Sequence, residues 1–393
     1  MSLRNSALRT LSVSALLLSV SFPAFAQDAN AVAERLKVLL AEQATDISWT
    51  SVSGDASKTV LEGVKIGSGP KESVAIGNLT LEGITEDNGA YKIQTATTDA
   101  AHIVSNGLTV DVSPAIFSGV VLPAEGSTDP LGSVLFYETA KMASVTVKKD
   151  DKEVFALTNA SADITSPQDG KAMEFTAAAE KFTADLTTVK DPKAKDAIDA
   201  LGYQTINGNM QMEGSWQPTD GRMTFSKYDV TVDNAGTIGL TFDLNGYTLD
   251  FLKSVQDMSK KMAEQPEADK SAQGIAMLGL MQQLNFQGAT IHFADDSLTG
   301  KVVDYVAKQQ GVKPADIVNQ AKAIVPFLTA QLQNPELSSQ ITSAVNAYLD
   351  NPKNLEIAAV PPQPVPFAAI AATGMSQPLE LPKQLGLKVT ANK

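Results

Sequence analysis

Histidine is the side chain best suited to moving protons near neutral pH, and this chain contains two of them. His102 follows a short segment of aspartate and alanine, and His292 lies between Ile291 and Phe293 in an expected strand. Because side chains alternate along a strand, His292 is expected to point away from both apolar neighbours. The chain also has no cysteine. We therefore interpret both histidines as ordinary polar side chains and predict no metal site and no cofactor.

A serine nucleophile is not indicated. The sequence contains no G-x-S-x-G elbow of the α/β-hydrolase type, and its single S-x-x-K match runs from Ser68 to Lys71. The Gly-Pro inside this match breaks the helical turn that would place the lysine behind the serine. We interpret the match as a surface turn and predict no catalytic residue.

Paired carboxylates could instead act as the acid and the nucleophile of a glycosidase. Asp295 and Asp296 form the best local pair, but they directly precede an expected helix start at Ser297. Negative charge there stabilises the exposed amides of the first turn, so we interpret the pair as a helix cap. Asp229 and Asp233 lack the glycine-containing loop of a calcium site and are interpreted as solvated side chains.

Four methionines are the residues that we nominate for ligand binding. They lie in two expected helices, at Met258, Met262, Met277 and Met281. Methionine is flexible and polarizable, so a surface rich in it accepts varied apolar ligands, although such residues also fill protein cores. We predict an apolar groove under these two helices.

The elements that must position these residues are mostly strands. Short runs rich in Val, Ile, Thr and Tyr alternate with Gly, Asn, Asp and Ser, which is typical of consecutive antiparallel strands with one buried face. We predict strands at 60–66, 74–81, 91–97, 108–112, 143–149, 153–159, 173–182, 208–216, 221–232, 237–244, 284–293, 355–360 and 385–390.

Helices are predicted where apolar residues recur every three or four positions. The first covers 29–44, a short one covers 193–201, and two more cover 248–262 and 271–284. Three further helices follow Ser297: one ends at Gly311, the second begins near Pro314, and the third is capped by Asn334.

These elements predict an α+β fold with a long, mainly antiparallel meander sheet, helices packed on one face, and a helical insert near 298–350. The expected regions are a signal peptide at 1–26, an N-terminal helix at 27–45, a β-rich region at 46–250, a mainly helical region with one strand at 251–350, and C-terminal strands at 351–393. A proline-rich crossing is expected to bring the last strand back to the sheet that starts near Val60.

The first 26 residues have the pattern of a secretory signal peptide. Arg4 and Arg9 give a basic start, residues 11–20 form an apolar centre, and Ala24-Phe25-Ala26 places small residues where a signal peptidase cuts. Cleavage after Ala26 predicts export to the periplasm without a transmembrane segment, because the apolar centre is shorter than the roughly 20 residues that span a bilayer. The zero cysteine count excludes a lipid anchor on cysteine.

The formal net charge is −13, with 44 acidic and 31 basic residues. Such a surface repels nucleic acid and anionic lipid headgroups, so a nucleic-acid partner is excluded.

Several phrases resemble known proteins: 61–66 (Leu-Glu-Gly-Val-Lys-Ile), the repeated strand-Gly-strand pattern, and Trp216-Gln217-Pro218 leading into 236–240. They are similar to β-rich envelope proteins of Gram-negative bacteria, in the loose AsmA-like or YdgA-like sense. The helices at 296–311 and from 334 resemble a helical insert of uncharacterised secreted relatives. This resemblance implies a role in envelope lipid homeostasis, although members of that group usually have a membrane anchor where this chain has a cleavable leader.

Three functions follow from the sequence. The first is a non-enzymatic soluble periplasmic protein that binds an apolar or lipid-like ligand in envelope maintenance. The second is a structural or interaction module that docks an envelope protein partner through a sheet edge or an acidic surface. The third, a carboxylate-based hydrolase, needs two acids that face each other across a cleft.

Overall fold

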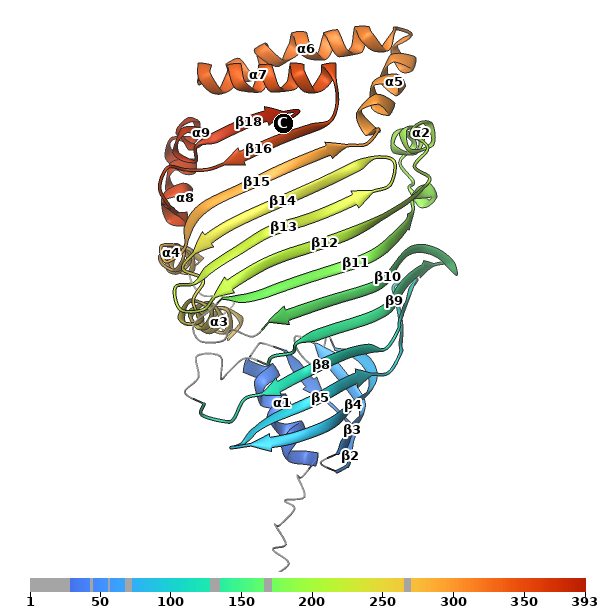
Figure 1. Cartoon of the computed structure of the whole chain (residues 1–393), viewed down its shortest axis with the longest axis vertical. Helices are drawn as coiled ribbons and strands as arrows, with labels where there is room; N and C mark the ends of the chain where they lie inside the picture. The colour runs from blue at the N-terminus through green and yellow to red at the C-terminus, as the bar shows by residue number, and fades with distance from the viewer. Residues whose placement is uncertain are drawn as a thin grey trace, which may run out of the picture.

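The computed structural model describes residues 29–42, 45–55, 57–67, 73–127, 135–165, 172–264 and 270–393. The leader predicted at 1–26 and the match at 68–71 lie outside these residues. Within them the fold is mixed α+β and consists mainly of one long, open antiparallel sheet, which confirms the predicted fold class (Figure 1).

In space, the main strands of the sheet follow the order β2, β3, β4, β5, β8, β9, β10, β11, β12, β13, β14, β15, β16 and β18. Four strands extend it locally: β1 pairs with β3, β7 with β9, β6 with β7, and β17 with β15. The strands are β1 (Asp46–Ser48), β2 (Ser51–Gly54), β3 (Lys58–Gly67), β4 (Val74–Asp87), β5 (Ala90–Thr98), β6 (Ala101–Ser105), β7 (Leu108–Val112), β8 (Ala115–Leu122), β9 (Thr139–Lys149), β10 (Lys152–Thr165), β11 (Met173–Asp185), β12 (Thr205–Gln217), β13 (Arg222–Val232), β14 (Gly236–Asn245), β15 (Asn285–Asp295), β16 (Asn354–Ala359), β17 (Val365–Pro366) and β18 (Leu387–Ala391).

The α-helices lie around the sheet. They are α1 (Ala29–Glu42), α2 (Pro192–Leu201), α3 (Leu249–Glu264), α4 (Lys270–Met281), α5 (Leu298–Gln310), α6 (Pro314–Ala330), α7 (Pro335–Asp350), α8 (Phe367–Ser376) and α9 (Leu381–Gln384). α1 packs on the first strands, and α7 packs on β16 and β18 at the other end. Figure 1 shows α3, α4, α8 and α9 along one side of the sheet, where strands end, and α2 and α5 along the opposite side.

The larger hydrophobic core lies under α1. Val32, Leu36 and Leu39 recur along one face of this helix and are almost fully buried, as the predicted periodicity requires. They pack in one cluster with Leu61 and Val64 of β3 and with apolar side chains of β4, β5 and β8. This cluster fixes the helix on the N-terminal end of the sheet.

A smaller core lies under α7 at the C-terminal end. Leu337 and Ala344 of the helix pack against Val389 of β18, and partly buried neighbours such as Leu355 complete the cluster. Helical cover is therefore strongest at the two ends of the sheet.

Asp150 and Asp151 form the two-residue turn between β9 and β10, and both have positive φ, 51° and 62°. The helix ends predicted at Asn334 and Gly311 are confirmed. The Asn334 side chain accepts a hydrogen bond of 3.0 Å from the Leu337 amide at the start of α7. Gly311 ends α5 with a left-handed φ of 65°.

The C-terminal segment ends in a strand of the same sheet. The last strand, β18, joins the sheet that contains Val60 through antiparallel pairing with β16. Strands that are close in the chain pair most readily. In addition, residues 367–376 form α8, which the sequence reading did not expect after four prolines.

Candidate ligand-binding face

Paired residues in an antiparallel sheet carry their side chains on the same face, so the register traces each face from strand to strand. One row of paired residues crosses ten strands from β8 to β18, and all its side chains are apolar. Its members are Ala115, Met142, Ala160, Ala179, Met210, Val230, Ile238, Phe293, Leu355 and Ala391. We call the side of the sheet that carries this row the apolar face.

A second row on the apolar face is rich in aromatic residues. It crosses eight strands through Ile164, Phe175, Gly214, Phe225, Phe242, Ala289, Ala359 and Leu387. The rings of Phe175 and Phe225 meet edge-on over β12, with centroids 5.6 Å apart. A Cβ atom at Gly214 would lie 2.4 Å from the Phe175 ring, so the glycine leaves room for the aromatic contact.

The opposite face of the same strands is polar. The equivalent row contains Lys141, Ser161, Ala178, Gln211, Asp229, Gly239, His292, Glu356 and Thr390. The sheet is therefore amphipathic across its central strands, and a protein of this kind needs a second layer on the apolar side.

Helices supply that second layer only in part. Val389 of β18 is 9% exposed beneath α7, whereas its partner Ile357 on β16 is 42% exposed. The same row continues through Ile291, 50% exposed, to Leu240, 38% exposed. With the neighbouring Ile238 and Tyr228, which are 55% and 40% exposed, these residues form a continuous exposed area. We call the five residues Tyr228, Ile238, Leu240, Ile291 and Ile357 the open patch.

The open patch extends over four neighbouring strands, β13 to β16. Single exposed apolar residues are common on proteins, but a contiguous group of large ones usually marks a binding surface. The patch contains one hydroxyl, that of Tyr228, and no charged side chain. Such a surface favours apolar ligands.

The apolar face follows from the alternation of residues in the strands. In β12 the apolar residues Ile206, Met210, Met212 and Trp216 occupy even positions, with threonine, asparagine, glutamine, glutamate or serine between them. In β10 the apolar positions shift at Asn159, whose φ is 51°. As a result, the apolar face carries the odd-numbered Phe155 and Leu157 before the shift. After the shift it carries the even-numbered Ala160 and Ile164.

The nominated methionines lie in α3 and α4. Met258 on α3 and Met281 on α4 are half-buried, and Met277 on α4 is 40% exposed. Met262 belongs to α3, but its side chain lies outside the described part of the structure. The two helices contact each other at the side of the sheet. A role of these methionines in binding stays a prediction, while the strands provide the apolar surface that sequence reasoning assigned to helices.

His292 takes the expected orientation on the polar face. Its Nε2 atom lies 3.7 Å from Oδ1 of Asp229, two strands away. Gly239 on the intervening strand makes this contact possible, because a Cβ atom there would lie 1.9 Å from the imidazole ring. Among the described residues, no group of three or more His, Asp or Glu side chains is arranged to hold a metal ion.

Asp295 acts as a helix cap, as predicted. Its carboxylate accepts hydrogen bonds of 2.8 Å from both the backbone N–H and the hydroxyl of Thr299 in the first turn of α5. The Thr299 hydroxyl also contacts the hydroxyl of Tyr348, and burial raises the pKa of that phenol. Because the carboxylate is engaged in this cluster, the geometry favours a structural role for Asp295 over hydrolysis.

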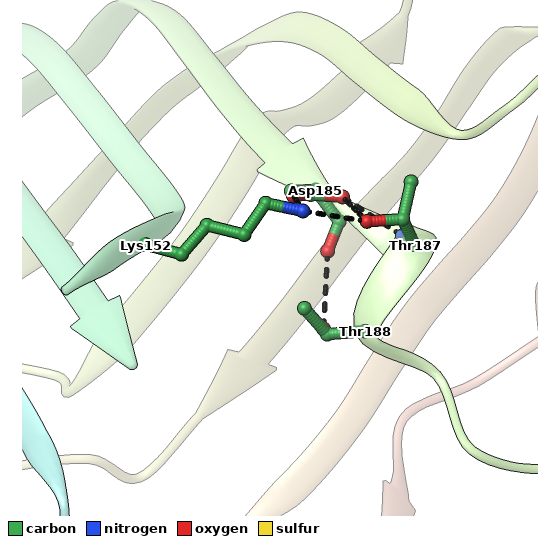
Figure 2. A network of polar contacts seen from close by, with 4 residues as sticks. All are labelled: Lys152, Asp185, Thr187 and Thr188. Carbon is green, nitrogen blue, oxygen red and sulfur yellow. Dashed lines mark hydrogen bonds and ion pairs between the residues drawn. The ribbon is translucent and has the colours of Figure 1, made fainter. Parts of the chain in front are cut away.

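Two further polar clusters lie away from the open patch. Asp111 contacts Nδ1 of His102 at 2.6 Å and Nζ of Lys148 at 2.9 Å, and these contacts lower the pKa of its carboxyl. Figure 2 shows the second cluster, in which Asp185 contacts Lys152 and Thr187 at the end of β11. Both clusters join neighbouring strands or loops, so their geometry supports a structural role.

The comparisons with known proteins leave the function open. A family model described only as an uncharacterized protein matches residues 229–392, from within β13 to the end of β18. Among curated proteins, no sequence matches the chain. No helix in the described residues combines the length and the hydropathy needed to cross a membrane.

Proposed function

We propose that this protein is a non-enzymatic periplasmic protein that binds an apolar or lipid-like ligand on its apolar face, as part of envelope maintenance. The observation that carries the proposal is the open patch, where five large apolar side chains on four adjacent strands are 38% to 55% exposed. The signal-peptide pattern at 1–26 supports export.

The dimensions of the apolar face suit a ligand with long hydrocarbon chains. Neighbouring strands lie about 4.8 Å apart, so a row across ten strands extends over about 43 Å. One leaflet of a bilayer has a hydrocarbon thickness of about 15 Å, half of the whole core. An extended acyl chain therefore fits along the row with room to spare. Burial of its methylene groups against the face stabilises the complex by the hydrophobic effect.

A dye-binding experiment tests the proposal. The double variant Ile238→Thr/Ile291→Thr replaces two side chains that are 55% and 50% exposed, so folding should be little affected. Threonine keeps the β-branched shape but removes apolar contact area. We expect the variant to bind the apolar dye N-phenyl-1-naphthylamine about tenfold more weakly than the unchanged protein.

A matched control is available on the same strand. Thr290 neighbours Ile291 but carries its side chain on the polar face, so Thr290→Ser should leave dye binding unchanged. Lipid extraction and native mass spectrometry of protein purified from the periplasm give a second readout. Equal dye binding by the double variant, together with repeated recovery of ligand-free protein, would contradict the proposal.

A further inference from the structure

Helix α4 exposes a segment that consists of apolar residues and glycine. Every residue from Gly274 to Gly279 is exposed, and this segment, Gly-Ile-Ala-Met-Leu-Gly, contains no polar side chain. Ile275 is 71% exposed, Met277 40% and Leu278 41%. A helix that is apolar all round is normally buried, either in a protein core or in lipid. This part of α4 thus requires an apolar covering.

Helix α8 is a neighbour of this segment. It packs against α4 at the side of the sheet (Figure 1) and contains no charged residue. Met375 near its end is 86% exposed, and Leu379 in the short 3-10 helix that follows (Pro378–Glu380) is 44% exposed. We call the group Ile275, Met277, Leu278, Met375 and Leu379 the apolar rim.

The charge of the molecule restricts what can cover the apolar rim. The chain carries 44 acidic and 31 basic residues, so a second copy and an anionic lipid surface are both repelled. Lys270 is the sole charged residue of α4, α8 has none, and Glu380 is the one charged residue of the 3-10 helix that carries Leu379. We propose that the apolar rim docks on the surface of a zwitterionic lipid bilayer, with its side chains inserted at the boundary between headgroups and acyl chains.

The apolar rim is continuous with the apolar face. Phe367 at the start of α8 meets Phe286 of β15 edge-on, with ring centroids 6.1 Å apart. Phe286 in turn lies 6.0 Å from Phe242, which belongs to the aromatic row of the sheet. Docking would place this aromatic path next to the bilayer, so that an apolar ligand could reach the sheet with little exposure to water. This last step rests on the proposed function, whereas docking itself does not.

Sedimentation with vesicles tests the docking. The probe is a vesicle of pure phosphatidylcholine, and the protein is the whole chain without added ligand. The double variant Ile275→Ser/Met375→Ser removes the two most exposed side chains of the apolar rim, and we expect it to bind about tenfold more weakly than the unchanged protein. Val104→Ser is the matched control, because Val104 is 67% exposed on β6, far from the rim, and should have no effect.

The proposal would be overturned if the unchanged protein did not sediment with the vesicles, or if the double variant sedimented equally. A loss caused instead by Phe327→Ser, which changes the 76% exposed ring on α6, would place the docking surface elsewhere and also overturn it. Thermal unfolding of each variant checks that the fold is kept. Dye binding by the open-patch variant Ile238→Thr/Ile291→Thr, measured without vesicles, tests the proposed function separately, because neither substitution lies in the apolar rim.

Discussion

Asp185 shows how one carboxylate can hold two strands and a loop together. Its Oδ2 atom lies 2.6 Å from Nζ of Lys152 at the start of β10. Its Oδ1 atom accepts hydrogen bonds of 2.8 and 2.6 Å from the backbone N–H and the hydroxyl of Thr187 (Figure 2). The bond from Lys152, followed by those from Thr187, lowers the carboxyl pKa to about 2 from a usual 3.8. The charged form of Asp185 therefore stabilises the folded state.

The lowered pKa predicts how stability depends on pH. Because the pKa of Asp185 is lower in the folded state, its contribution is complete above about pH 4 and is lost as the pH falls towards about 2. We expect Asp185→Asn to lower the thermal unfolding midpoint at pH 7, and the difference from the unchanged protein to shrink between pH 4 and about pH 2. Asp163→Asn, an exposed position on β10, is the control. A difference that stays constant with pH would contradict this role of the charge.

At the scale of single elements, the hairpin between β9 and β10 depends on an unusual turn. Asp150 and Asp151 both have positive φ, which type I′ turns require and which glycine adopts without strain. We predict that Asp151→Gly stabilises the protein by about 0.5–1 kcal/mol, measured by chemical denaturation. Glu153→Gly in the same hairpin should destabilise it, because that residue lies within the strand and does not need positive φ. Equal changes in stability for the two glycine variants would show that the positive φ at Asp151 does not destabilise the protein.

Most elements could be predicted from the sequence because each has a local signal. The spacing of apolar residues every three or four positions predicted α1. Single residues such as Asn334 and Gly311 predicted where helices begin or end. Strands β1, β2, β6, β8 and β17 and helices α8 and α9 were not predicted. β2 and β6 are short, at four and five residues, and their alternation extends over too few positions to be distinctive. α8 follows a proline-rich segment, has no side-chain hydrogen bond at its N-terminal cap, and packs against α4 and β17, so no local signal in the sequence marks its start.

The apolar nature of the candidate site could be predicted from the sequence, but its location could not. The sequence indicated one apolar sheet face, but the location of the open patch depends on register and on how far α7 reaches. Shifts such as the one at Asn159 move apolar residues from odd to even positions, so that simple alternation along β10 fails. The methionines were nominated because helical spacing is visible in a sequence, whereas a row across ten strands becomes visible only once the pairing is known.

At the scale of the whole molecule, the sheet joins two packed ends through a central part with less cover. The N-terminal end has fully buried side chains such as Leu61 and Val64, and the C-terminal end has the smaller cluster around Leu337 and Val389. Between them, the open patch leaves residues of β13 to β16 exposed on the apolar face. Cooperative unfolding depends on shared packing, so these two ends are expected to open as separate units.

Hydrogen exchange measures this separation directly. Leu61 is 0% exposed, and Leu61→Ala should destabilise its own end by about 2–5 kcal/mol through lost contacts and a residual cavity. We expect faster amide exchange in α1, β3, β4 and β5, and unchanged exchange in β13 to β16. Leu337→Ala is the reciprocal variant, because it lies in the other cluster and should affect α7, β16 and β18 instead. A uniform increase over all strands in either variant would show that the backbone ladder alone couples the two ends, and that the exposed centre of the sheet is no boundary between folding units.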